Sequence, residues 1–387
     1  MVKNRKETFR ILLLMGTSHG YGRQLIDGAT QYLYESGHRA DFEFRGYDEP
    51  IPPWVREWKG DGILTRRGDT RTSTILRPLN VPVVTVSCLE EESDLTVDED
   101  AVAALAVAHF QERGLQHFAY YTQCDLYWTQ LRERAYVSAV ERIGKKCHVF
   151  VRRTKTFVPW YGWKTSEKKR LAQWLDDLPK PVGLLAAHDL HAREILDLCQ
   201  VESISVPGEV AILGTSNEAW FCRLPNPGLS SIIQDSRRLG YEAARILCAK
   251  IRGEPFPEMP LRFPPLGIET RGSTDVIAVN DEDMVQAKQL VREGAERGIT
   301  VKEILEELQI SRRTLERKYK ATFGRTLAAD IVTTRIERAK ELLRETDWAV
   351  GNIARLLHFV SEVHFFHVFR REVGCSPLEY RQRKHSL

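Results

Sequence analysis

The residue types best suited to chemistry gather in one short stretch near the end of the sequence. Residues 361–380 read SEVHFFHVFRREVGCSPLEY and contain two histidines, two arginines and three phenylalanines. Histidines at i and i+3, as His364 and His367 are, could hold a zinc ion from one helix face. A zinc site needs further ligands, and the one nearby candidate is His358, across a turn. The spacing therefore disfavours a metal site.

The same stretch is expected to form a helix over residues 362–371 with two unlike sides. His364, His367 and Arg371 share one side, where they would be exposed and could contact DNA bases and phosphates. A solvated face without a role is the alternative. The opposite, apolar side is expected to be buried and consists of Val363, Phe365, Phe366 and Phe369.

A repeat of two helix–turn–helix units positions this helix. Apolar residues recur at i, i+3, i+4 and i+7 in residues 301–308 and again, 49 positions later, in residues 350–357. Each set is followed by a short turn and a second helix, which gives helix–turn–helix units over 301–322 and 350–371. Thr300 with Glu303 forms a capping box, while Ser311 and Ser361 can cap the second helices.

The first unit supports a DNA-binding interpretation. Residues 311–344 contain ten basic and four acidic residues, a net +6, whereas the whole chain carries only +3. The connecting helix over 327–343 would be roughly 25 Å long, which with the helix radii approaches the roughly 34 Å between successive major grooves on one DNA face. The expected DNA-binding residues are Arg312, Arg313, Glu316, Arg317, Lys320, Ser361, Glu362, His364, His367, Arg370 and Arg371.

The segment IARLLHFVSEVHFFHVFRREVGCSPLEYR (353–381) resembles the signature of AraC/XylS-family transcription regulators. The resemblance covers about 283–383 and implies that the helices 312–322 and 362–371 read DNA. His358 stands where the family usually has glycine in the turn. The matching positions are Phe359, Ser361, Phe365, Phe369, Arg370, Arg371, Gly374, Ser376, Pro377, Tyr380 and Arg381.

The first two thirds of the chain follow a different pattern. Short apolar runs such as 9–15, 118–122, 182–187 and 210–215 alternate with amphipathic stretches of helical length. This order predicts βαβ units and parallel sheets, which bind ligands at the carboxyl ends of their strands. We expect an α/β domain over 8–270, a linker over 271–282 and an all-α DNA-binding domain over 283–383.

The loop GTSHGYGR (16–23) follows the first expected strand. Its glycine spacing matches neither dinucleotide- nor triphosphate-binding loops. A tight turn that offers Ser18, His19 and Tyr21 as polar contacts is therefore favoured over nucleotide binding.

Residues 186–247 resemble the effector domains of LacI-type regulators and type I periplasmic sugar-binding proteins, which implies a two-lobed fold. The matching positions are Asp189, Val206, Pro207, Gly214, Asn217, Pro227, Leu229, Ser230, Ser231 and Ile232. The resemblance covers about 8–270. Joined to a C-terminal AraC-type domain, this is the arrangement of xylose operon regulators.

This resemblance implies effector contacts at Arg132, Trp163, Asp189, Ser216 and Asn217. Ser216 stands where an acidic residue is expected, which leaves the identity of the sugar open. Each assignment has a structural alternative. Asp189 could cap a helix, Trp163 could belong to the core, and Arg132 could form a surface ion pair.

Composition sets limits on other functions. The 387 residues suffice for several domains, the seven cysteines form no CxxC pair, and no apolar run approaches the roughly 20 residues that span a bilayer. We expect a cytoplasmic protein without cofactor, metal, catalytic residues or membrane partner.

The expected function is that of a ligand-responsive, sequence-specific DNA-binding regulator, an activator of sugar catabolic genes. Its partners would be operator DNA, a monosaccharide effector, a second copy of the chain and, for an activator, RNA polymerase. A sensor of another small molecule, a repressor, a protein-binding module and an enzyme are the alternatives.

Overall fold

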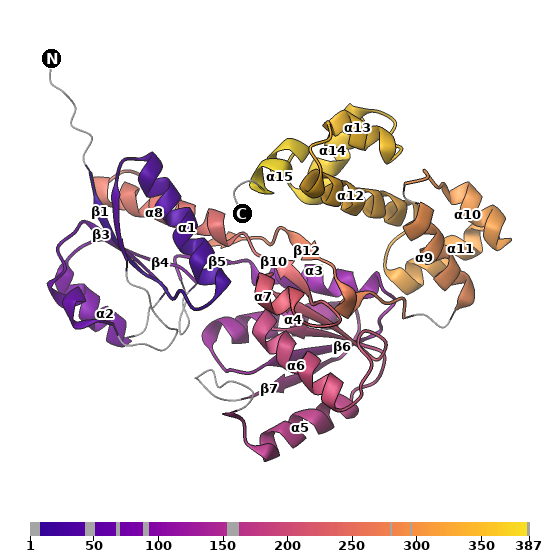
Figure 1. The fold of residues 1–387 in the computed structure, drawn as a ribbon, viewed down its shortest axis with the longest axis horizontal. Coiled ribbons are helices and arrows are strands. Elements are labelled where there is room, and N and C mark those ends of the chain that lie inside the picture. The colour runs from indigo at the N-terminus through magenta and orange to yellow at the C-terminus, as the bar shows by residue number, and fades with distance from the viewer. Residues whose placement is uncertain are drawn as a thin grey trace. The chain divides into compact units, whose positions relative to one another are not determined.

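The computed structural model describes residues 8–42, 51–66, 70–87, 93–152, 162–278, 281–294 and 296–384 (Figure 1). The chain divides into two compact units. The first comprises residues 1–107 and 117–275, and the second comprises residues 108–116 and 276–387. The change of unit at 275 falls inside the expected linker.

The first unit contains a four-stranded parallel sheet in the order β2-β1-β3-β4. Its strands are β1 (Arg10–Leu14), β2 (Arg39–Phe42), β3 (Gly62–Thr65) and β4 (Val83–Thr85). Helices α1 (Gly20–Glu35) and α8 (Ser236–Arg252) pack closely on each other. Glycine makes this approach possible, because a Cβ at Gly28 would lie 1.8 Å from the Arg237 carbonyl oxygen. The helix α2 (Thr70–Leu76) completes this part.

A six-stranded sheet in the order β12-β10-β9-β8-β6-β7 forms the rest of the first unit. All neighbours are parallel except β10 and β12. The strands are β6 (His117–Thr122), β7 (Cys147–Val151), β8 (Val182–Ala186), β9 (Val210–Thr215), β10 (Ser230–Ile233) and β12 (Gly267–Glu269). The helices are α3 (Glu99–Gln111), α4 (Tyr127–Arg142), α5 (Thr165–Asp176), α6 (Asp189–Val201) and α7 (Ala219–Arg223). A separate parallel pair joins β5 (Leu95–Val97) to β11 (Leu261–Phe263).

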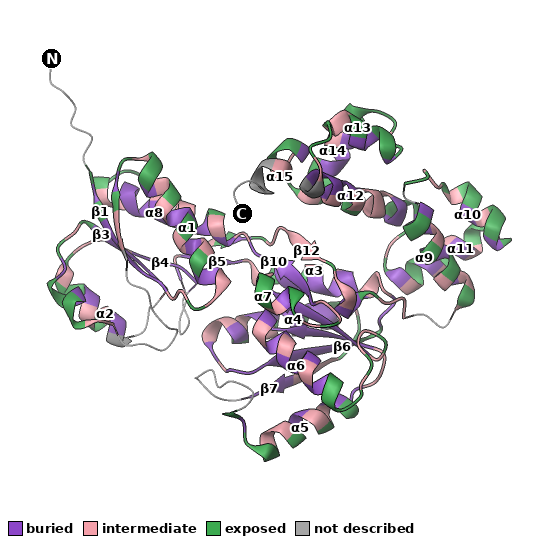
Figure 2. Ribbon diagram, viewed as in Figure 1, coloured by how far each residue is buried: buried purple, intermediate pink, exposed green. Residues whose placement is uncertain are grey.

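The second unit is helical over its described residues, which confirms the expected fold class of an α/β domain followed by a helical one. Its helices are α9 (Glu282–Gly294), α10 (Val301–Leu308), α11 (Arg312–Phe323), α12 (Leu327–Glu345), α13 (Val350–Leu356), α14 (Glu362–Val373) and α15 (Pro377–Lys384). Two apolar cores lie along α12, one against α9–α11 and the other against α13–α14 (Figure 2). Among the described helices, none is long and apolar enough to cross a membrane.

The caps expected from the sequence are present. The Ser311 hydroxyl accepts a hydrogen bond from the Thr314 amide at 3.2 Å, and that of Ser361 accepts one from the His364 amide at 3.0 Å. The Glu303 carboxylate accepts hydrogen bonds from the amide and hydroxyl of Thr300. These bonds satisfy amide groups that a helix start leaves unpaired.

The expected buried side of α14 was partly wrong. Phe365, Val368 and Phe369 are the buried residues, whereas Val363 is 66% exposed and Phe366 is half-buried. At 3.6 residues per turn, Val363 points roughly 160° away from Phe365 around the helix. An i, i+3, i+6 series drifts off the core-facing stripe, while i, i+3, i+4 stays on it.

Candidate functional site

A pocket in the first unit collects side chains from the ends of strands of both sheets. Its hollow measures about 760 Å³ when the open space at its mouth is included. The polar and aromatic lining comprises His19, Tyr21, Arg66, Ser87, Thr96, Glu99, Trp128, Arg132, His188, His191, Ser216 and Gln234. Carboxyl ends of parallel strands are where such folds bind ligands.

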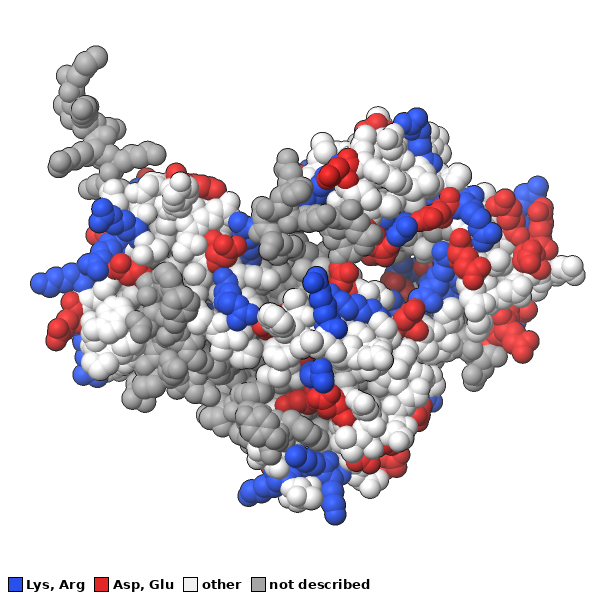
Figure 3. Space-filling model, viewed as in Figure 1, with Lys and Arg blue, Asp and Glu red and all other residues white. Residues whose placement is uncertain are grey.

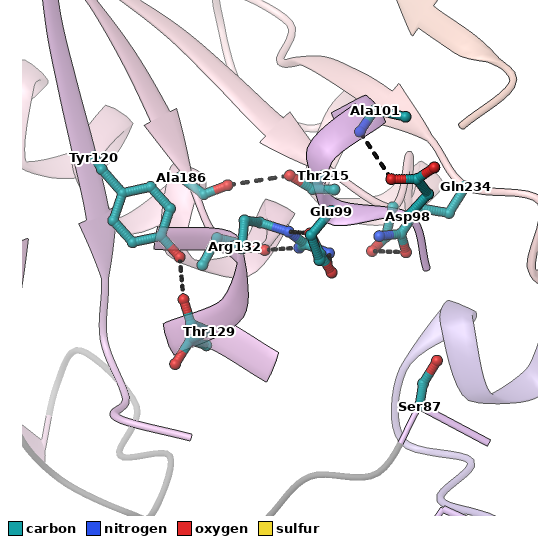
Figure 4. A network of polar contacts seen from close by, with 12 residues as sticks. Ser87, Asp98, Glu99, Ala101, Tyr120, Thr129, Arg132, Ala186, Thr215 and Gln234 are labelled. Carbon is teal, nitrogen blue, oxygen red and sulfur yellow. Dashed lines mark hydrogen bonds and ion pairs between the residues drawn. The ribbon is translucent and has the colours of Figure 1, made fainter. Parts of the chain in front are cut away.

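A buried ion pair holds one wall of the pocket. Arg132 on α4 donates to both carboxylate oxygens of Glu99, at 2.7 Å each, and Figure 4 shows the two side chains facing each other. Burial disfavours the charged form of Arg132, but the Glu99 carboxylate outweighs this, so the pKa of Arg132 is raised. The Trp128 ring lies 5.3 Å from the same guanidinium. The two hydrogen bonds fix the geometry of the Arg132–Glu99 pair, and its net charge is zero.

Three uncharged imidazoles form a second wall. The ring centres of His19 and His188 lie 5.3 Å apart, and those of His188 and His191 lie 6.2 Å apart. Burial lowers the pKa of His191 to about 3 and holds that of His188 well below its ordinary value. The Nδ1 atom of His191 is buried without a hydrogen-bond partner among the described residues. Such a nitrogen is available to a polar group that enters the pocket.

Arg66, directly after β3, stands at the other side of the pocket. Its Nε and Nη2 both donate to the Ser87 carbonyl oxygen at 3.4 Å, and its guanidinium lies 4.8 Å from the centre of the Tyr21 ring. The Tyr21 hydroxyl and the Ser87 hydroxyl are 2.7 Å apart. Across the site the Ser216 hydroxyl donates to Gln234 Oε1 at 3.3 Å, which gives a neutral edge.

The structure brings three of the seven expected effector residues to the pocket and leaves four outside it. Tyr21, Arg132 and Ser216 line the cavity. Ser18 is exposed and bonds to its neighbour His19, with Oγ 3.1 Å from Nδ1. Trp163 belongs to the hydrophobic core of the six-stranded sheet, with the Arg152 guanidinium 4.4 Å from its ring.

Asp189 and Asn217 support the pocket from behind. Asp189 is fully buried and accepts hydrogen bonds from the Ser231 hydroxyl at 2.5 Å and the Glu218 amide at 2.7 Å. Burial raises the pKa of this carboxyl to about 6. Asn217 Oδ1 accepts from Arg271 at 2.9 Å. These bonds fix the turn after β9, where Ser216 and Asn217 have φ angles of 112° and 51°.

Several lining residues were not found from the sequence, although two carried a signal. Trp128 precedes Arg132 by four positions and so shares its helix face. Arg66 directly follows the short apolar run at 62–65, which forms β3, and the end of a strand is the position where ligand contacts are expected. Glu99, His191 and Gln234 carried no comparable signal, because other chain segments bring them into place.

The expected DNA-binding residues lie on the surface of α11 and α14. All are exposed except Glu316, which is half-buried. Within the described part of the chain, Arg312, Arg313, Arg317 and Lys320 form no ion pair, whereas Arg371 pairs with Glu372 at 2.7 Å. On the face drawn in Figure 3 basic and acidic side chains are interspersed, so charge alone does not mark a binding surface.

Both helix–turn–helix turns contain a non-glycine residue in the left-handed region. Gln309 has φ 53° and His358 has φ 55°. His358 additionally places Nε2 3.0 Å from the Glu296 carbonyl oxygen, in the α9–α10 loop. Gly298 allows this contact, because a Cβ there would lie 2.5 Å from the imidazole.

Comparison with known proteins agrees with this architecture. Residues 107–274 match the family model of the periplasmic binding protein-like domain, and residues 304–383 match that of a helix-turn-helix domain. The pocket domain and the paired DNA-binding units therefore define a transcription regulator that responds to a small molecule.

Similar proteins of full length narrow this class. The chain is 30% identical to the xylose operon regulatory protein of Escherichia coli K12 over 386 residues, 96% of each chain. It is 29% identical to that of Haemophilus influenzae, over 97% of this chain and 99% of that one. A solved structure of the xylose-binding transcription activator xylR matches with a TM-score of 0.61 and 28% identity, over 97% of this chain and 98% of that one.

The chain belongs to the family of the xylose operon regulatory proteins, and it is a sugar-responsive transcription regulator that binds DNA through its helix–turn–helix units. A more distant structure, a periplasmic binding protein/LacI regulator from Alkaliphilus metalliredigens QYMF with D-xylulofuranose, shows the shared fold. It covers 68% of this chain and 98% of that one, with a TM-score of 0.55 and 17% identity.

Proposed function

We propose that a pentose or related polyol binds in the pocket and raises the affinity of the protein for an operator, so that the chain activates sugar catabolic genes. The observation that carries this proposal is the lining itself. Trp128 offers an aromatic face, while Arg132, Glu99 and the uncharged His191 supply hydrogen-bonding groups for hydroxyls. The relatives are named for xylose, a pentose, which supports an effector of pentose size.

DNA would be read by α11 and α14. Four cations of α11 have no ion pair among the described residues and can approach phosphates: Arg312, Arg313, Arg317 and Lys320. The polar residues of α14 can approach base edges. The connecting helix α12 has 19 residues and is therefore roughly 28 Å long. Two recognition helices at its ends suit half-sites one turn of DNA apart, at roughly 34 Å.

The remaining expectations belong to this proposal. The effector-binding domain would span 8–270, the linker 271–282 and the DNA-binding domain 283–383. The active form would be a cytoplasmic homodimer that contacts RNA polymerase. The chain would carry out no catalysis, and conversion of a bound sugar to a product would contradict this part.

A combined binding experiment tests the proposal. The full chain is screened by thermal shift against monosaccharides and polyols, and its DNA is selected from a random duplex library with and without each ligand that stabilises it. At saturation, stabilisation of about 2.7 kcal/mol is expected when the ligand is at 100 times its Kd. Selected duplexes should bind more tightly with ligand present.

A variant makes the result specific to the pocket. Trp128→Ala should weaken sugar binding by roughly tenfold or more, because the aromatic surface is lost. Tyr34→Ala is the matched control, since Tyr34 is an aromatic residue that is 87% exposed and lies outside the pocket. No stabilisation by any sugar or polyol would exclude the proposed effector class, and lower operator affinity with ligand would contradict activation.

A further inference from the structure

The charges that line the pocket do not cancel. Within the lining, the ionised groups are Arg66, Arg132 and Glu99, because burial keeps the imidazoles uncharged at neutral pH. Both oxygens of Glu99 are taken by Arg132. Among the residues that the structure describes, no carboxylate lies within ion-pair distance of Arg66. Among the described residues that line the pocket, one positive charge is therefore left over.

Arg66 is also under-used as a hydrogen-bond donor. A guanidinium has five N–H groups in a planar fork, and the described contacts of Arg66 are two long bonds to one carbonyl oxygen. The guanidinium is half-buried against the Tyr21 ring, which limits its hydration. It lies close enough to His19 and His188 to contribute, after burial, to lowering the pKa of both. Arg66 and these two imidazoles line the same pocket.

The opposite side of the pocket is suited to hydroxyl groups. His191 is 3% exposed and its Nδ1 has no partner in the described residues, so it can accept a hydrogen bond from a ligand hydroxyl. The Ser216–Gln234 pair adds neutral donors and acceptors. An ammonium or a second cation on the ligand would meet no free carboxylate among these groups.

We propose that the effector is a sugar acid, a monosaccharide-sized polyol whose carboxylate binds Arg66 and whose hydroxyls contact His191 and its neighbours. This inference rests on the proposed function and narrows the class of sugar. A planar carboxylate fits the guanidinium fork, and its single negative charge balances the one positive charge left uncompensated among the described lining residues. A phosphate dianion would leave one negative charge beside Glu99. Carboxylate is therefore favoured over phosphate.

Calorimetric titration of the full chain tests the charge. The ligands are D-xylose and D-xylonate, D-glucose and D-glucuronate, and D-glucose 6-phosphate. At least one acid should bind tenfold or more tightly than its neutral counterpart, because a hydrogen bond to a charged group contributes about 1.5–3 kcal/mol. The acid should also lose affinity as sodium chloride is raised.

Three variants locate the effect. Arg66→Met should lower the affinity for the acid about 10- to 100-fold and that for neutral sugars by less than about threefold. His191→Phe keeps an aromatic ring and removes the nitrogens, so it should weaken acids and neutral sugars alike. Arg134→Met, an exposed arginine on α4 outside the pocket, is the control. Thermal unfolding without ligand verifies that each variant is folded.

The outcomes separate this inference from the proposed function. If neutral sugars bind as tightly as acids, or Arg66→Met weakens both equally, the sugar-acid inference is wrong and the proposed function stands. Tighter binding of the sugar phosphate overturns the choice of carboxylate. If none of these ligands binds, the sugar-acid inference fails, and the broader screen of monosaccharides and polyols decides the proposed function.

Discussion

The two helix–turn–helix units share one plan but differ in what holds their cores together. In the first unit, Lys288 of α9 donates to Asp330 of α12 at 2.6 Å in a site that excludes solvent, and the Tyr319 hydroxyl donates to the same carboxylate. In the second unit, aromatic rings pack in series at tilted and edge-on angles, with centroids 4.9 Å apart for Phe359–Phe365 and 5.5 Å for Phe365–Phe369.

This difference teaches that one motif can be stabilised in two ways with unequal tolerance to change. An aromatic core loses energy in proportion to the surface and contacts removed. A buried polar network is favourable only while every member is satisfied, and it becomes costly when one partner is lost. Burial lowers the pKa of Lys288, which shows the desolvation that Asp330 offsets. The first unit should therefore fail more abruptly.

The largest expected effect comes from Asp330→Ala. The change leaves Lys288 and the Tyr319 hydroxyl buried without their shared acceptor, so the first unit should lose about 3–5 kcal/mol of stability. Hydrogen exchange of amides in α9–α12 of the full chain measures the loss locally. Exchange in α14 should change less. Glu341→Ala, at a half-buried position of the same helix outside the network, is the control.

A triple variant decides whether the stability lost in Asp330→Ala comes from unpaired buried polar groups or from lost packing. The combination Lys288→Met, Tyr319→Phe and Asp330→Leu removes the three hydrogen-bonded members, and it should recover most of the stability that Asp330→Ala loses. It leaves Arg325, whose Nη1 lies 3.8 Å from Asp330 Oδ1. If the triple variant is as unstable as the single one, the network is not the cause. If Asp330→Ala leaves exchange unchanged, the contrast between the two cores is refuted.

The next effect concerns DNA affinity and the unequal freedom of the cations. Arg317 is exposed without an ion pair among the described residues, whereas Arg371 already pairs with Glu372. Arg317→Ala should weaken binding to a selected operator about 10-fold and reduce the salt slope by about one. Arg371→Ala should weaken DNA binding less. In the free chain Arg371 already pairs with Glu372, so a new contact with phosphate would replace this ion pair and add less affinity. Filter binding over a range of salt concentrations measures both.

Controls tie this effect to the second helices. Lys302→Ala removes an exposed cation from α10, where it pairs with Glu306 at 3.5 Å, and should leave DNA affinity within about twofold. Sugar binding should be the same in all three variants. Equal losses for Lys302 and Arg317 would mean that net charge rather than α11 governs binding.

The ease of predicting each region from sequence follows from how it is built. The exposed residues of α11 and α14 could be predicted because helix faces repeat every 3.6 residues and depend on neighbours in sequence. Val363 was wrongly predicted to be buried, because a series of residues three positions apart gradually turns away from the buried side of the helix. The longer strands were evident as apolar runs, whereas β5, β10, β11 and β12 have at most four residues and lack such a signal.

The pocket could be predicted only in part because its members come from distant segments. Arg66 follows β3, Glu99 begins α3 and His191 lies in the first turn of α6. The direction of each side chain decides whether a residue at a strand end reaches the cavity. Ser216 lines the pocket, whereas its neighbour Asn217 supports it from outside. Asp189 shows the same limit, because its buried hydrogen bonds were not evident from the sequence.

The smallest expected effect compares the two turns. Gln309 and His358 both hold φ angles near 55°, which glycine adopts at lower cost. Gln309→Gly should raise the stability of the chain by about 0.5 kcal/mol, after the greater freedom of glycine in the unfolded state is subtracted. His358→Gly should give no gain, because it also removes the contact with the Glu296 carbonyl, worth about 1 kcal/mol.

Urea unfolding of the full chain, followed by the exchange of amides in each unit, resolves changes of this size. Gln309→Ala is the matched control, since alanine keeps a Cβ and should not gain stability. A gain from both glycine variants would show that the His358 contact contributes nothing. The second turn would then be held by the helices it joins, and the units would differ only in their cores.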